Sequence, residues 1–84
     1  MKKIPIGNIS STIDLGRFVR AHRKEQQATQ SEFAALCGVG TRFISELENG
    51  KPTIQIGKVL QVLSCLGLEV TLQPRGWKHI ERSK

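Results

Sequence analysis

Between residues 29 and 50 the apolar positions follow a helical period twice, and a short stretch with two glycines separates the two runs. Thr29 is expected to begin the first helix, because its hydroxyl can accept from a free backbone amide while Glu32 reaches back in a capping box. The apolar face of this helix consists of Phe33, Ala34, Leu36 and Cys37. Gly38 stands where a helix ends in a left-handed residue, so the pattern predicts a helix that stops before Gly38.

A second short helix is predicted from Thr41 to Glu48, after a turn at residues 38–40 and before a stop at Asn49-Gly50. Its apolar positions are Phe43, Ile44 and Leu47. Val39 is too apolar for an exposed turn, so we expect it to pack between the two helices. Two helices joined in this way form a helix-turn-helix, whose second helix can enter the major groove of DNA.

One helix is predicted before this pair and one after it. The first runs from Thr12 to Gln26 and has apolar residues at Leu15, Phe18, Val19 and Ala21. The last is expected to be capped by Thr53 and is the most apolar helix of the chain, with Ile54, Ile56, Val59, Leu60, Val62, Leu63 and Leu66. These apolar residues are too many for a single stripe along one face of the helix, so we expect some of them to contact another subunit.

After Gly67 the period changes, because Leu68, Val70 and Leu72 alternate with polar residues until Pro74. A single strand leaves its backbone groups unpaired and therefore needs a partner strand. The partner is either residues 3–6 of the same chain or a second copy of the strand across a twofold axis, and we favour the copy. The predicted fold class is all-α: a compact bundle of four to five helices with a helix-turn-helix, plus one short C-terminal β-strand that pairs across a dimer.

The length of 84 residues allows one small domain. We divide the chain into an N-terminal arm (1–11), a helix-turn-helix DNA-binding domain (12–67), a dimerisation strand (68–73) and a basic C-terminal tail (74–84). The arm either contacts a partner or is an ordinary terminus. Trp77 in the tail either covers the end of the sheet, which we favour, or anchors a partner.

The chain is basic, because 13 Lys and Arg against 7 Asp and Glu give a net charge of +6. Such a balance favours a polyanionic partner, either nucleic acid or an anionic membrane. No apolar run approaches the roughly 20 residues of a membrane span, and no signal-peptide hydrophobic region follows Lys2-Lys3. We therefore expect a cytoplasmic protein that binds nucleic acid.

Metal and catalytic chemistry are not expected. Cys37 and Cys65 have no Cys or His at metal-ligand spacing, so both are interpreted as small buried hydrophobes. His22 and His79 are interpreted as surface side chains. Neither a nucleophile triad, a phosphate-binding glycine loop nor a pair of carboxylates occurs at usable spacing, which argues against an enzyme, a metal site or a cofactor.

Taken together, these positions resemble the lambda repressor-like helix-turn-helix family, also called XRE. The matching residues are Leu15-Gly16, Val19-Arg20, Arg23, Thr29-Gln30, Phe33-Ala34, Gly38-Val39, Ile44-Ser45 and Glu48-Asn49-Gly50. The resemblance implies a compact bundle of about five helices that binds operator DNA as a twofold dimer. The strand in LGLEVTL is similar to that of the HipB antitoxins and implies a repressor of its own operon that holds a HipA-type kinase toxin. The alternative is a stand-alone repressor of phage or operon type.

The resemblance also implies roles for single residues. Thr41, Arg42 and Ser45 occupy base-reading positions, and Arg42 suits a bidentate bond with guanine. Glu46 shares their face, where it can accept from cytosine or pair with Arg42. The expected phosphate contacts are Arg17, Gln30, Asn49 and Lys51; the expected structural ion pair is Arg23 with Glu48; and the expected dimerisation residues are Leu68, Val70 and Leu72.

Overall fold

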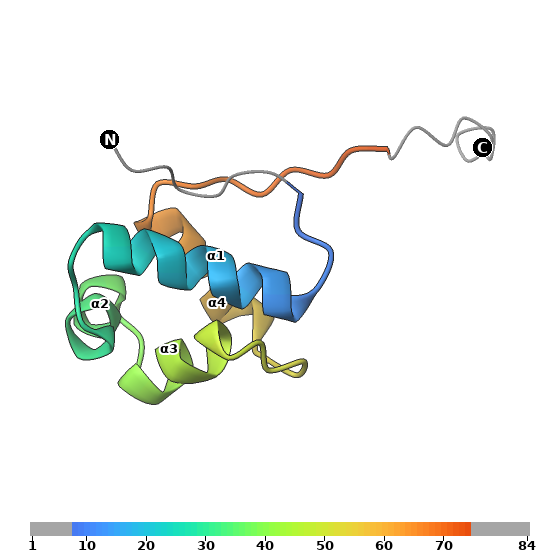
Figure 1. Cartoon of the computed structure of the whole chain (residues 1–84). Helices are drawn as coiled ribbons and strands as arrows, with labels where there is room; N and C mark the ends of the chain where they lie inside the picture. Colours follow the sequence, from blue (N-terminus) through green and yellow to red (C-terminus); the bar gives the residue numbers. More distant parts are fainter. Residues whose placement is uncertain (1–7, 75–84) are drawn as a thin grey trace.

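The computed structural model describes residues 8–74, and within this range the chain forms four helices (Figure 1). They are α1 (Thr12–Glu25), α2 (Gln30–Cys37), α3 (Thr41–Glu48) and α4 (Ile56–Cys65). In Figure 1, α1 lies along one side of the bundle, α2 and α3 lie below it, and α4 lies behind them. Helix α1 packs mainly on α3, and α2 packs on both α3 and α4. The predicted all-helical bundle with a helix-turn-helix is confirmed for the part of the chain that the structure describes.

One apolar core joins the four helices. Its buried side chains come from all of them: Val19, Phe33, Ala34, Cys37, Ile44, Leu47, Val59, Val62 and Leu63. Val39 in the turn between α2 and α3 packs against this core, as its apolar character predicted. The short helices therefore depend on tertiary packing, because isolated helices of eight residues are not stable in water.

Local polar contacts start helix α1, and a change of backbone conformation ends it. The Ser11 hydroxyl accepts from the amide of Asp14, and the Ser10 amide donates to the Asp14 carboxylate. This backbone hydrogen bond from Ser10 is the main cause of a lowered pKa at Asp14. The helix ends at Glu25, one residue earlier than predicted, because Gln27 adopts a left-handed φ of 58°.

The caps of α2 agree with the sequence prediction, whereas one of its apolar residues does not. Both hydrogen bonds of the Thr29–Glu32 capping box are present, and Gly38 ends the helix with a φ of 74°. Leu36 was expected on the buried face but is 68% exposed. It lies roughly 100° around the helix axis from the centre of the arc formed by Phe33, Ala34 and Cys37, and this arc alone meets the core.

Helix α4 starts later than predicted. The amide of Ile54 donates to the carbonyl of Lys51 at 3.3 Å, so Thr53 lies inside a turn and does not cap the helix. Gln55 precedes the first helical residue and gives no side-chain cap. Cys65 was expected to be buried but is exposed at the edge of the core, although its thiol neighbours that of the core residue Cys37.

Residues 68–74 run as an extended segment (Figure 1) that forms no strand with the other described residues, so the predicted strand is not confirmed within residues 8–74. Leu68 packs partly on the core, whereas Val70 is 56% and Leu72 94% exposed. A strand requires a neighbouring strand for its ladder of hydrogen bonds. The intramolecular candidate, residues 3–6, lies outside the described residues, as do Trp77 and His79.

Candidate nucleic-acid interface

The exposed face of α3 carries the residues that were predicted to read bases. Thr41 and Arg42 at its first turn are exposed, while Ser45 and Glu46 one turn later are partly buried. The opposite side holds Ile44 and Leu47 in the core, so α3 is fixed by one face and open on the other. An α-helix exposed in this way fits the width of the major groove.

Glu46 differs from its neighbours because its carboxylate is already engaged. Its Oε2 accepts from Arg42 Nε at 3.2 Å, and its Oε1 lies 3.3 Å from Lys51 Nζ. These cations, Lys51 first and Arg42 after it, lower the pKa of Glu46. The side chain of Arg42 is nevertheless 90% exposed, so its guanidinium projects from the domain beside this carboxylate.

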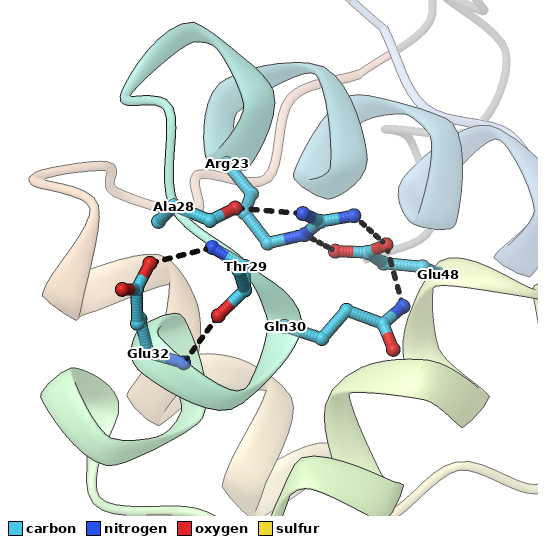
Figure 2. A network of polar contacts seen from close by, with 6 residues as sticks. All are labelled: Arg23, Ala28, Thr29, Gln30, Glu32 and Glu48. Carbon is cyan, nitrogen blue, oxygen red and sulfur yellow. Dashed lines mark hydrogen bonds and ion pairs between the residues drawn. The ribbon is translucent and has the colours of Figure 1, made fainter.

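A buried ion pair connects the end of α3 to α1 (Figure 2). Arg23 donates from Nε to Glu48 Oε2 at 2.7 Å and from Nη2 to Oε1 at 2.9 Å, in bidentate geometry. The two side chains are 10% and 3% exposed. The hydrogen bond to Glu48 raises the pKa of Arg23 further above its ordinary value, against the opposing effect of burial. The structure thus contains the ion pair that the resemblance implied.

The same network includes α2 and the loop before it. Arg23 Nη1 donates to the carbonyl oxygen of Ala28 at 2.8 Å, and Gln30 Nε2 donates to Glu48 Oε1 at 3.1 Å (Figure 2). The contact between Gln30 and Glu48 was not predicted, since nothing in the spacing of these residues indicates it. Nε2 of Gln30 has a second N–H, which remains available for a phosphate oxygen at the start of α2.

Close packing of α1 on the C-terminal end of α3 sets the position of the interface. A Cβ built on Gly16 would lie 2.4 Å from the carbonyl oxygen of Leu47, so only glycine permits this approach. Thr12 Oγ1 also donates to the carbonyl oxygen of Gly50 at 2.8 Å. The close approach at Gly16 and the bond from Thr12 place the start of α1 against the last residues of α3 and the turn after it.

The predicted phosphate contacts fall on three segments, with Gln30 on α2 and the others on α1 and after α3. Asn49 and Lys51 are exposed directly after α3, and Arg17 is exposed on α1. Arg20 and Lys24 follow Arg17 at spacings of three and four residues and are also exposed, so the three cations form one stripe along α1. Arg20 and Lys24 belong to the basic set of this helix, whose charges were expected to point at water or phosphate, although only Arg17 was predicted as a specific phosphate contact.

The remaining reactive groups do not form a second site within residues 8–74. Burial, together with the neighbouring thiol of Cys65, raises the pKa of Cys37 to about 12, so Cys37 is not a nucleophile at neutral pH. In this range no three His, Cys, Asp or Glu side chains gather where they could hold a metal ion. Among the same residues, no helix is long and apolar enough to cross a membrane.

Comparisons with known proteins agree with this geometry. A family model described as a helix-turn-helix domain matches residues 14–75. The uncharacterised HTH-type transcriptional regulator y4mF of Sinorhizobium fredii is 53% identical over 68 residues, which span 81% of this chain and 90% of that protein.

Two solved structures are similar in fold. HipB in a HipB–O4 20mer complex is 27% identical, with a TM-score of 0.74 over 83% of this chain and 99% of that chain. A chain of a HipA–HipB–O2–O3 complex is also 27% identical, with a TM-score of 0.73 over 83% and 99% of the two chains. The sequence matches cover most of the domain, including both helices of the motif. The chain belongs to the XRE-like helix-turn-helix family of transcriptional regulators.

Proposed function

We propose that this regulator is a repressor that binds operator DNA as a twofold dimer and reads bases with α3. The observation that carries the proposal is the exposed first turn of α3, where Thr41 and Arg42 project from a helix whose opposite side is buried. In a twofold dimer, two such helices enter successive major grooves roughly 34 Å apart. A protein with this role works in the cytoplasm, on the nucleoid.

Base reading is assigned to Thr41, Arg42 and Ser45. The guanidinium of Arg42 can donate two hydrogen bonds to O6 and N7 of guanine, and the Thr41 methyl can contact a thymine methyl. The hydroxyl of Ser45 can donate a hydrogen bond to a base edge or accept one from it. Phosphate contacts from Gln30, Asn49 and Lys51 on one side and Arg17 on the other would fix the depth and direction of α3.

Replacing Arg42 with alanine is expected to weaken binding to the preferred duplex by about 1–3 kcal/mol and to relax the preference at one base pair per half-site. Binding isotherms on a duplex selected from a random library, and on its single-base variants, measure both effects. Arg20→Ala is the control, because an exposed cation on α1 is expected to contribute equally to all sequences. Equal weakening by Arg42→Ala on selected and random DNA would assign Arg42 to phosphate contact instead.

We also propose that residues 68–73 pair with their own copy in an antiparallel ribbon. Val70 and Leu72 are exposed in the single chain, and Ile56 and Leu60 of α4 are 64% and 45% exposed. Together these side chains offer apolar surface that a second copy could cover. From Glu69 onwards the extended backbone has no partner strand within residues 8–74, and a twofold ribbon would satisfy it.

Proline substitutions test this ribbon, because proline removes a backbone N–H donor. Only alternate residues of an antiparallel strand direct their N–H groups at the partner, so Glu69→Pro and Val70→Pro form a matched pair. One of the two is expected to raise the dimer dissociation constant by about tenfold or more, equivalent to roughly 1.4 kcal/mol. Sedimentation equilibrium measures the constant. Unchanged dimerisation in both variants would rule out the ribbon.

We further propose that the chain acts as a HipB-like antitoxin that represses its own operon and binds a HipA-type kinase. Support comes from the similarity to HipB chains over almost their whole length, including a chain from a complex with HipA. Co-expression with the HipA-type kinase of the same host, followed by size-exclusion chromatography, tests the partnership. Separate elution of the two proteins would favour the alternative, a stand-alone repressor with the same DNA chemistry.

A further inference from the structure

Glu46 occupies an unusual place on the DNA-facing side of α3, because it is an acid among residues that meet a polyanion. Its two carboxylate oxygens are divided between two cations. Oε2 accepts from Nε of Arg42 at 3.2 Å, and Oε1 lies 3.3 Å from Nζ of Lys51. The three residues form a small charged cluster that spans the helix and the second residue after its C-cap.

Folding stability does not explain this cluster. The side chains of Arg42, Lys51 and Glu46 are 90%, 44% and 30% exposed, and ion pairs so accessible to solvent contribute little to stability. Within a helix, an acid four residues after a base is also the less favourable order. The arrangement is better explained by what it does to the two cations that face DNA.

For Arg42, the contact fixes which donors remain free. The guanidinium carries five N–H groups in a rigid plane, and the carboxylate of Glu46 accepts from the one on Nε. The Nε edge of the guanidinium therefore faces Glu46, and the end edge, with one N–H of Nη1 and one of Nη2, remains free and suits a bidentate bond to guanine. Holding a flexible side chain in this orientation before binding reduces the entropy lost when the base contact forms.

The contact with Glu46 reduces the sequence-independent attraction of Lys51 to DNA phosphates. One carboxylate between two cations leaves a net charge of +1 where the cations alone would present +2. A base contact by Glu46 itself would bring a negative charge towards the phosphates. The geometry therefore favours a role that acts through its neighbours.

We propose that Glu46 is a positioning residue for sequence discrimination: it directs the terminal N–H groups of Arg42 at a base and weakens the non-specific attraction of α3 to DNA. This inference rests on the proposed reading of bases by α3. It assigns Glu46 to specificity without a direct base contact, and it explains why an acid is present on this face.

Glu46→Gln tests the inference, because glutamine keeps the length of the side chain and removes its charge. Affinity for a random-sequence duplex is expected to rise by about threefold, with a steeper salt dependence by up to about one phosphate contact. Preference at the base pair that Arg42→Ala identifies is expected to fall by about threefold to tenfold, a part of the effect of Arg42→Ala itself. Fluorescence anisotropy on the selected duplex, its single-base variants and a random duplex provides all of these values.

Two further variants separate the two parts of the role. Glu46→Asp keeps the charge but is one methylene shorter, so it is expected to retain the low affinity for random DNA and to lose preference at the Arg42 base pair. In an Arg42→Ala background, Glu46→Gln is expected to change preference at no base pair. The thermal midpoint of Glu46→Gln should stay within about 2 °C of the parent protein, since the lost contacts are exposed.

An unchanged base preference in Glu46→Gln would overturn the inference. So would a loss of preference at a second base pair that persists in the Arg42→Ala background, because it would show that Glu46 reads a base of its own. If the parent protein showed no preference for any sequence, the proposed function itself would fail, and that outcome is visible before any variant is made.

Discussion

Replacing Arg23 with methionine is expected to lower the free energy of unfolding by about 3–5 kcal/mol. The substitution leaves the Glu48 carboxylate, of which only 3% is exposed, with a single donor from Gln30. It also removes the donor to the carbonyl of Ala28. A small domain has a total stability of about 5–15 kcal/mol, so much of the margin would be lost. Urea denaturation followed by circular dichroism measures the change.

The double variant Arg23→Met with Glu48→Met is the informative control. Replacing a whole buried ion pair with apolar side chains of similar size is often neutral or stabilising, whereas removing one partner strands the other charge. We therefore expect the double variant to recover most of the stability that the single variant loses. A loss below about 1 kcal/mol in the single variant would mean that water reaches Glu48 and screens it.

Local signals explain why the helix-turn-helix could be predicted closely from sequence. The capping box at Thr29 and Glu32 and the left-handed Gly38 depend on contacts within four residues, so their spacing alone identifies them. The bounds of α3 were predicted correctly for the same reason, since the Gly40 turn and the Asn49-Gly50 stop enclose it. The start of α4 was predicted wrongly. Thr53 has a side chain that can cap a helix, but it lies in the turn that the hydrogen bond from Ile54 to Lys51 closes.

Burial was harder to predict, because periodicity gives the angle of a residue around its helix but not which neighbours cover it. The helical period placed Leu36 and Cys65 on apolar faces, yet both residues are exposed. Whether a second subunit or another partner covers such residues depends on contacts that a single chain does not contain. The pairing of the segment after Gly67 depends on a partner strand in the same way.

In the candidate site, too, some features follow from helical periodicity and others depend on tertiary packing. The exposed face of α3 follows from its helical period, whereas the link from Gln30 to Glu48 joins residues on different helices and depends on how α2 and α3 pack. The engagement of Glu46 by Lys51 likewise depends on the chain turning back after α3. Sequence reasoning identified the residues on this face and left two roles open for Glu46.

Replacing Gly16 with alanine is expected to destabilise the domain by about 3 kcal/mol or more, although alanine is the better helix former by about 1 kcal/mol. The new Cβ would lie 2.4 Å from the carbonyl oxygen of Leu47 and 2.7 Å from that of Glu48. Both obstacles are backbone atoms, so no side-chain rotation relieves the overlap. Relief requires α1 to move away from α3, which would also strain the bond between Arg23 and Glu48.

Gly57 in α4 provides a matched control, because a Cβ added there meets nothing within 4 Å. Gly57→Ala is expected to leave stability unchanged or to raise it by up to about 1 kcal/mol, since only helix propensity changes. Thermal unfolding of the two variants side by side separates steric overlap from propensity. If Gly16→Ala were as stable as Gly57→Ala, α1 could shift on α3 without cost, and the close approach at Gly16 could not be what sets the position of α3.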